Sequence, residues 1–177
     1  MIICRPGKGH ARREPYGGRV RPLAVFDIDG VLADVAHRVR YLEQDDPDWG
    51  RFFQAAPRDG VHEQGRALAL EAAVDCDLAY LTGRPEWCRA DTERWLEQHG
   101  LPDGELVMRR NGDHRPARKA KPELLRSLAA DRVVAVVVDD DLEVCDAYEQ
   151  AGWTVLRALW APRSVALQHA QEDAGRT

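Results

Sequence analysis

Short apolar runs alternate along this chain with longer segments in which apolar residues recur at helical spacing. Runs of this kind are typical of strands buried on both faces. Strands are expected at residues 23–26, 78–81, 106–108, 133–138 and 154–159. Helices are expected at residues 35–42, 61–73, 86–99, 122–130 and 142–151. The alternation predicts an α/β fold, with a mostly parallel sheet and helices on both faces.

Two acids, Asp27 and Asp29, directly follow the first expected strand, and Gly30 suits the abrupt turn after them. In open α/β sheets, ligands bind beyond the carboxyl ends of the strands. Close carboxylates repel unless a cation or a shared proton relieves them, and Mg²⁺ bound by oxygen ligands would do so. The pattern indicates an Asp nucleophile, an Asp acid or base and a metal. The alternative interpretation is an acidic turn after a strand.

Polar groups also follow two later strands. Thr82 and Gly83 end the expected strand 78–81, where a hydroxyl can donate to a phosphoryl oxygen or cap the next helix. Three successive acids, Asp139 to Asp141, follow the strongest strand signal, and part of this cluster could cap the following helix.

A basic tract separates these two groups. Seven of the thirteen residues in 109–121 are basic if His114 is included. A lysine in this tract could neutralise a phosphate and the charge of a nucleophile. The alternative is a solvated basic loop, which is the usual outcome for a run of charges.

Together, these four segments resemble, in order, the four motifs of the haloacid dehalogenase (HAD) superfamily, whose phosphatases begin with Asp-x-Asp-Gly. The resemblance covers residues 23–159 and implies a Rossmann-like HAD fold. One departure is Val31, where many members have Thr. The change removes a hydroxyl but no catalytic group.

The resemblance also implies a mechanism. Asp27 would attack phosphorus and form an aspartyl-phosphate, while Asp29 would protonate the leaving oxygen and then activate water. Thr82 would hold the phosphoryl oxygens, and a lysine would neutralise developing charge. The expected ligands of Mg²⁺ are Asp27, the backbone carbonyl of Asp29, Asp139 and Asp140.

A closer likeness is to the 3′-phosphatase domain of bacteriophage polynucleotide kinase-phosphatase. It depends on the small cap, the Leu-Val-Met strand at 106–108, and Asp113-x-Arg115 with Lys121 six positions later, which favours Lys121 over Lys119. This likeness implies a DNA or RNA 3′-phosphate end as substrate. The substrate-binding residues expected on this basis are Gly83, Arg84, Arg109, Arg110, Arg115 and Arg118.

Two alternative functions stay open: a phosphatase for a nucleotide or another small molecule, and an inactive HAD-fold module that binds a partner. The intact acids at 27, 29, 139 and 140 speak against the inactive module. The net charge of −5 provides no overall basic field for nucleic acid, although it does not exclude a local basic patch.

The expected domain organisation is a flexible basic leader (1–22), a phosphatase domain (23–162) with a small cap insertion (34–60), and a polar tail (163–177). Trp49, Phe52 and Phe53 are expected to pack the cap. The four cysteines are scattered, which argues against a zinc site and a disulfide framework and fits a reducing cytosol. No apolar run is long enough to span a bilayer, so a cytoplasmic protein without a membrane partner is expected.

Overall fold

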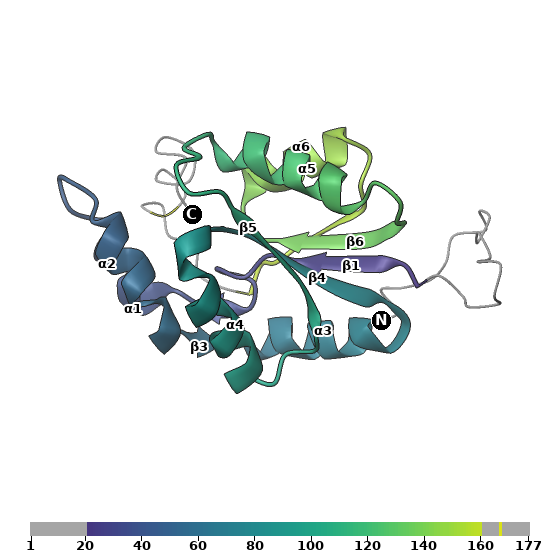
Figure 1. The fold of residues 1–177 in the computed structure, drawn as a ribbon, viewed down its shortest axis with the longest axis horizontal. Coiled ribbons are helices and arrows are strands. Elements are labelled where there is room, and N and C mark those ends of the chain that lie inside the picture. Colours follow the sequence, from purple (N-terminus) through teal and green to yellow (C-terminus); the bar gives the residue numbers. More distant parts are fainter. Residues whose placement is uncertain (1–20, 161–166, 168–177) are drawn as a thin grey trace.

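The computed structural model describes residues 21–160 and Leu167 (Figure 1). The expected leader and tail therefore fall almost entirely outside the described residues. Within those residues, no helix combines the length and apolar character needed to cross a membrane.

A five-stranded parallel sheet in the order β5-β4-β1-β6-β7 forms the centre of the fold (Figure 1). Its strands are β1 (Leu23–Phe26), β4 (Asp77–Pro85), β5 (Gly104–Arg109), β6 (Val134–Asp139) and β7 (Val155–Arg157). The middle strand β1 is completely buried, which explains its continuous apolar sequence.

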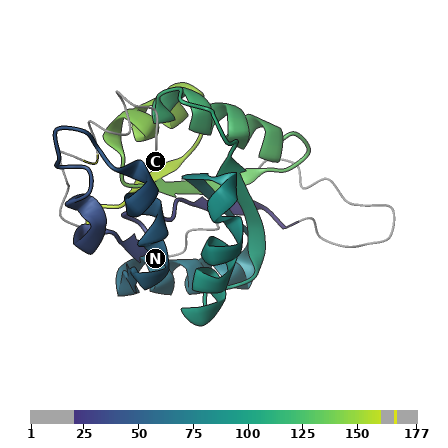
Figure 2. The same cartoon turned by 60° about the vertical axis from the view of Figure 1, so that its left-hand side comes forward.

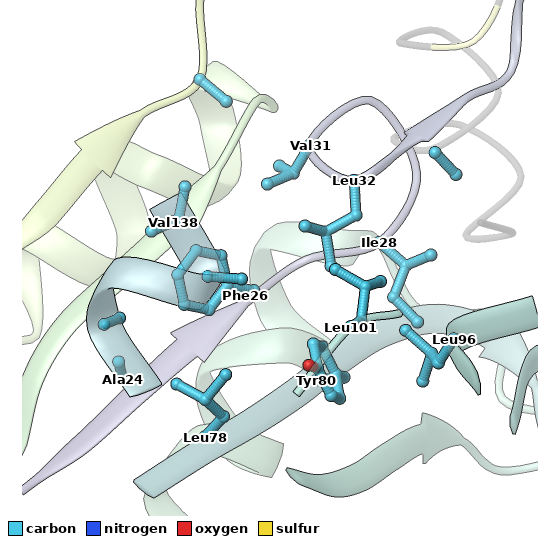
Figure 3. Packing of buried hydrophobic residues seen from close by; sticks show 14 of the residues in the cluster. Ala24, Phe26, Ile28, Val31, Leu32, Leu78, Tyr80, Leu96, Leu101 and Val138 are labelled. Carbon is cyan, nitrogen blue, oxygen red and sulfur yellow. The ribbon is translucent and has the colours of Figure 1, made fainter. Parts of the chain in front are cut away.

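Helices cover both faces of this sheet, as predicted (Figure 1). On one face lie α3 (Glu63–Asp75) and α4 (Arg89–Gln98), the latter preceded by the 3₁₀ turn η2 (Glu86–Cys88). On the other face lie α5 (Ala117–Leu128) and α6 (Leu142–Gln150). Side chains of β1 alternate between the two cores. Phe26 packs with Leu78, Tyr80 and Val138 under α3 and α4 (Figure 3), whereas Val25 packs under α5 and α6.

The segment expected to form the cap contains short elements beyond the carboxyl edge of the sheet (Figure 2). These are β2 (Ala33–Asp34), α1 (Ala36–Val39), α2 (Trp49–Gln54), η1 (Ala56–Arg58) and β3 (Gly60–Val61). Strands β2 and β3 pair antiparallel. As expected from their spacing, the three aromatic residues of α2 pack together, with ring centroids 5.4–5.8 Å apart. They form a separate core with Val39, Leu42 and Met108.

One expectation from the sequence is wrong. Helix α5 begins at Ala117 and not at Pro122, because Ala117, Lys121 and Leu125 form a buried face within the basic tract. Pro122 is tolerated inside the helix and does not begin it.

Candidate active site

The polar residues at the strand ends converge at one edge of the sheet. Asp27 directly follows β1, and its amide donates to the carbonyl of Val138 in β6 over 2.9 Å. Asp139 ends β6, and Thr82 lies in β4 on the other side of β1. Since these neighbouring strands are parallel, their carboxyl ends must meet, as the sequence analysis expected.

Lys121 is the basic residue that lies between Asp27 and Asp139. Its Nζ lies 3.0 Å from Oδ2 of Asp27 and 2.9 Å from Oδ2 of Asp139, and the side chain is buried. Burial alone would lower the pKa of Lys121, but the charges of Asp139 and Asp27 raise it well above its ordinary value. Lys119 instead lines a groove between α5 and α6. The geometry therefore selects Lys121 from the two lysines considered.

Three carboxylates, those of Asp27, Asp139 and Asp140, form a candidate metal centre. Each offers an oxygen, and the three oxygens lie within 4.8 Å of one another. Oδ1 of Asp27 and Oδ1 of Asp140 are buried without a hydrogen-bond partner. Oxygen-only ligands with unsatisfied charge are what Mg²⁺ requires, so these residues fit that ion.

The pKa values of the same acids reflect their crowding. Burial, supported by the charges of Asp139 and Asp29 and opposed by Lys121, raises the pKa of Asp27 to about 7. Burial and the charges of Asp139 and Asp27 raise the pKa of Asp140 well above its ordinary range. A bound dication would favour the ionised form of both.

Gly30 makes the close approach of these segments possible. Its φ is +83°, which favours glycine, and a Cβ there would lie 2.2 Å from Oδ2 of Asp140. The glycine that follows Asp29 is therefore required for backbone conformation and for space beside the acids.

Asp29 lies in a second, buried ion-pair cluster with Arg38, Asp59 and Arg84. Oδ1 of Asp29 accepts from Nη2 of Arg38 (2.7 Å) and from Nε of Arg84 (2.9 Å). Both arginines also donate to Oδ2 of Asp59, over 2.8 Å and 2.9 Å. Burial alone would raise the pKa of Asp29, but Arg38 and Arg84 lower it to about 2. Oδ2 of Asp29 is buried and has no partner, so it can still exchange a proton with a ligand.

Sequence reasoning missed Arg38 and Asp59. Both come from the cap segment, at α1 and before β3, where nothing in the pattern distinguishes them from surface charges. It also placed Arg84 among the substrate-binding residues, whereas this guanidinium is already engaged by two carboxylates.

The remaining predicted residues separate into two groups. Thr82 is buried, and its Oγ1 accepts from the amide of Arg84 over 3.2 Å, which leaves the hydroxyl hydrogen free to donate. Gly83, Arg109 and Arg110 line a cavity between the cap and the loop after β5. Arg115 is exposed and donates to Asp113, and Arg118 lines the groove between α5 and α6. Neither of these last two is brought to the acids.

Comparison with known proteins agrees with this geometry. Several solved structures share the fold. In the Pnkp1/Rnl/Hen1 RNA repair complex, a chain is similar with 22% identity and a TM-score of 0.64, over 87% of this chain but 46% of that one. This chain thus spans less than half of that protein. No curated protein matches it by sequence.

Two further structures are similar along most of their own length. A haloacid dehalogenase-like hydrolase, SP0104 from Streptococcus pneumoniae, has 15% identity and a TM-score of 0.56, covering 86% of this chain and 92% of that one. The HAD-hydrolase YfnB from Bacillus subtilis, solved bound to magnesium, has 11% identity and a TM-score of 0.53, covering 77% and 88%. At these identities the likeness establishes the fold.

A family model provides the stronger result. The model described as "Polynucleotide kinase PNKP phosphatase domain" matches residues 22–159, most of the chain and every element that contributes to the site. This chain therefore belongs to the PNKP phosphatase-domain family of HAD phosphatases.

Proposed function

We propose that this chain is a Mg²⁺-dependent phosphomonoesterase that removes the 3′-phosphate from a nucleic-acid end through an aspartyl-phosphate on Asp27. The observation that carries the proposal is the convergence of Asp27, Lys121, Asp139 and Asp140 at one sheet edge, with buried carboxylate oxygens that lack partners. The 3′-phosphate end as substrate is supported by membership of the family.

Asp27 is the proposed nucleophile because an ion pair fixes one of its carboxylate oxygens while the other has no hydrogen-bond partner. Its Oδ2 lies beside Lys121, and its Oδ1 has no hydrogen-bond partner. Attack by Asp27 on phosphorus would break the ester bond and give the aspartyl-phosphate. Lys121 would neutralise charge during this step, and the Thr82 hydroxyl would donate to a phosphoryl oxygen. When bound, Mg²⁺ would supply positive charge to the phosphoryl group and to its carboxylate ligands.

Asp29 is the proposed acid and base. Arg38 and Arg84 keep it ionised in the free site, so its carboxylate is available to accept a proton from the water that hydrolyses the intermediate. To protonate the leaving oxygen it must first gain a proton. Solvent supplies this proton, and the approach of a phosphate dianion favours its uptake, because a nearby negative charge raises the pKa of a carboxyl.

A substrate panel with wild type and Asp27→Asn tests the proposal. Wild type is expected to release phosphate from p-nitrophenyl phosphate only with Mg²⁺, and to prefer a 3′-phosphorylated oligonucleotide to mononucleotides. Asp27→Asn is expected to lose both activities. Full activity of Asp27→Asn would exclude this residue as the nucleophile. Equal or better turnover of mononucleotides would indicate a small-molecule phosphatase, and no turnover at all would leave a binding module.

A further inference from the structure

A cavity of about 290 Å³ lies between the cap and the loop that follows β5. Gly83 in its wall directly follows Thr82, so the cavity and the Thr82 hydroxyl are carried by neighbouring residues of β4. Side chains from three separate segments form the wall. The residues that matter here are Trp49, Phe53, Trp87, Arg109 and Asp113.

Arg109 is a buried cation with donors to spare. The side chain is 3% exposed, and its Nη1 donates to the carbonyl of Arg115 over 2.9 Å, which fixes its position. Its Nε and Nη2 are buried and have no hydrogen-bond partner. Across the described part of the chain, no carboxylate lies within salt-bridge distance of Arg109. Leaving a buried guanidinium unpaired is costly, so an anion that reaches these two donors would be favoured.

The free donors of Arg109 also have the right geometry for such an anion. Nε–H and one Nη2–H point from the same edge of the guanidinium plane, and that edge binds two oxygens of a phosphate or carboxylate in parallel. Asp113 lines the cavity too, but Nε and Nη2 of Arg115 donate to its carboxylate over 3.0 Å and 2.8 Å. The acid in this wall is therefore already neutralised by another arginine.

Aromatic rings form the other part of the wall. Trp87 is 53% exposed, unusual for a large apolar ring in this structure, and it contacts Phe53 edge-on at a centroid distance of 5.9 Å. Phe53 in turn stacks on Trp49 at 5.8 Å. The amide of Trp87 donates to Oδ1 of Asn111 in the loop after β5, which ties the two walls together. An exposed tryptophan with buried rings behind it provides a surface on which a nucleobase can stack.

We propose that this cavity binds the terminal nucleoside of a 3′-phosphorylated strand, with the base against Trp87 and the 5′-side phosphodiester on Arg109. This inference rests on the proposed function. A strand end carries two anions, one on each side of its last sugar: the 3′-phosphate to be removed and the phosphodiester to the rest of the chain. A 3′-mononucleotide has only the first. Arg109 would therefore distinguish a strand end from a free nucleotide.

The experiment uses three substrates that add these features one by one: p-nitrophenyl phosphate, thymidine 3′-monophosphate and thymidine 3′,5′-bisphosphate. Wild type is expected to have the highest kcat/KM on the bisphosphate. Arg109→Gln should reduce kcat/KM for the bisphosphate by about 10- to 100-fold, which is the range for a lost pair of charge-assisted hydrogen bonds. For the other two substrates, kcat/KM of this variant should stay within about twofold of wild type. Arg94→Gln, which removes an exposed arginine on α4, is the matched control and should change none of the three.

Trp87→Ala tests the nucleoside part separately. Because the ring is exposed, its removal should not prevent folding. It should lower kcat/KM about tenfold for both thymidine substrates, as expected for a lost base stack, and leave p-nitrophenyl phosphate unchanged.

Several results would overturn the inference. Equal losses on the monophosphate and the bisphosphate in Arg109→Gln, or no loss on either, would show that Arg109 does not bind the second phosphate. Loss of p-nitrophenyl phosphate hydrolysis in this variant would give Arg109 a structural or general role instead. An unchanged Trp87→Ala would exclude the base platform. Failure of the proposed function is distinguishable, because wild type itself would then not release phosphate from the 3′-phosphorylated substrates.

Discussion

The buried cluster of Arg38, Arg84, Asp29 and Asp59 allows one prediction to be worked out in detail. Two carboxylates balance two guanidinium groups, and all four side chains are buried. Asp59→Asn would preserve the shape and remove one negative charge. Oδ1 of Asp59 accepts from Nε of Arg38 and from the His37 ring, each over 2.8 Å, and Oδ2 accepts from Nη2 of Arg38 (2.8 Å) and Nη2 of Arg84 (2.9 Å). Whichever oxygen the amide nitrogen replaces, at least two of these donors would then face another donor.

The expected magnitude follows from burial. Breaking a buried ion pair by removing one partner costs about 3–5 kcal/mol, because an uncompensated charge stays in the interior. For a domain of this size, a loss of that order lowers Tm by about 10 °C. Urea or thermal unfolding, followed by circular dichroism, measures it directly.

The matched control is Asp91→Asn, which removes the carboxylate partner of Arg94 in a pair whose side chains are 49% and 60% exposed, at an N–O distance of 2.9 Å. An exposed pair contributes at most about 1 kcal/mol, so this variant should unfold close to wild type. If Asp59→Asn lost no more stability than Asp91→Asn, the conclusion that the cluster is held by balanced buried charges would be wrong.

Three further predictions concern the acids. Gly30→Ala should abolish phosphatase activity, because its Cβ would displace Asp140. The control is Gly152→Ala, where φ is +91° and no atom lies within 4 Å of the added Cβ. It should lower the free energy of unfolding by about 1–2 kcal/mol and leave kcat unchanged. In wild type, Mg²⁺ at ten times its Kd should add about 1.4 kcal/mol to the free energy of unfolding. Calorimetry of Asp140→Asn should find no such gain. An equal gain in this variant would argue against the metal centre. Lys121→Gln should lower kcat by about 100-fold or more, while Lys119→Gln should be unchanged, and similar losses in both would refute the choice of Lys121.

The sequence alone determined the order of the elements and the edge at which Asp27, Thr82 and Asp139 meet. Both depend on local properties. A continuous apolar run indicates a strand buried on both faces, and parallel strands bring their carboxyl ends to a single edge. The packing of Trp49, Phe52 and Phe53 in a small separate core could be predicted for the same reason, since their spacing places them on one side of a short helix.

The basic tract marks the limit of local reasoning. A run of charges is usually solvated, and a proline at Pro122 is typical of the first turn of a helix. Burial of Ala117, Lys121 and Leu125 against the sheet extended α5 by five residues and directed Lys121 at the acids. The likeness to the bacteriophage 3′-phosphatase domain favoured Lys121 over Lys119, and the contact with Asp27 and Asp139 supplies the physical reason.

Tertiary structure alone decided how charge is distributed around the site. In the folded chain, Asp29 pairs with Arg38 and Arg84, and Asp59 at the end of the cap segment pairs with the same two arginines. Nε and Nη2 of Arg109 have no hydrogen-bond partner. Which buried charge finds a partner depends on side chains that lie far apart in the sequence and meet only when the cap folds over the sheet edge. A pattern of hydrophobic and polar positions records whether a residue can be buried, and it carries no information on the partner that residue will meet.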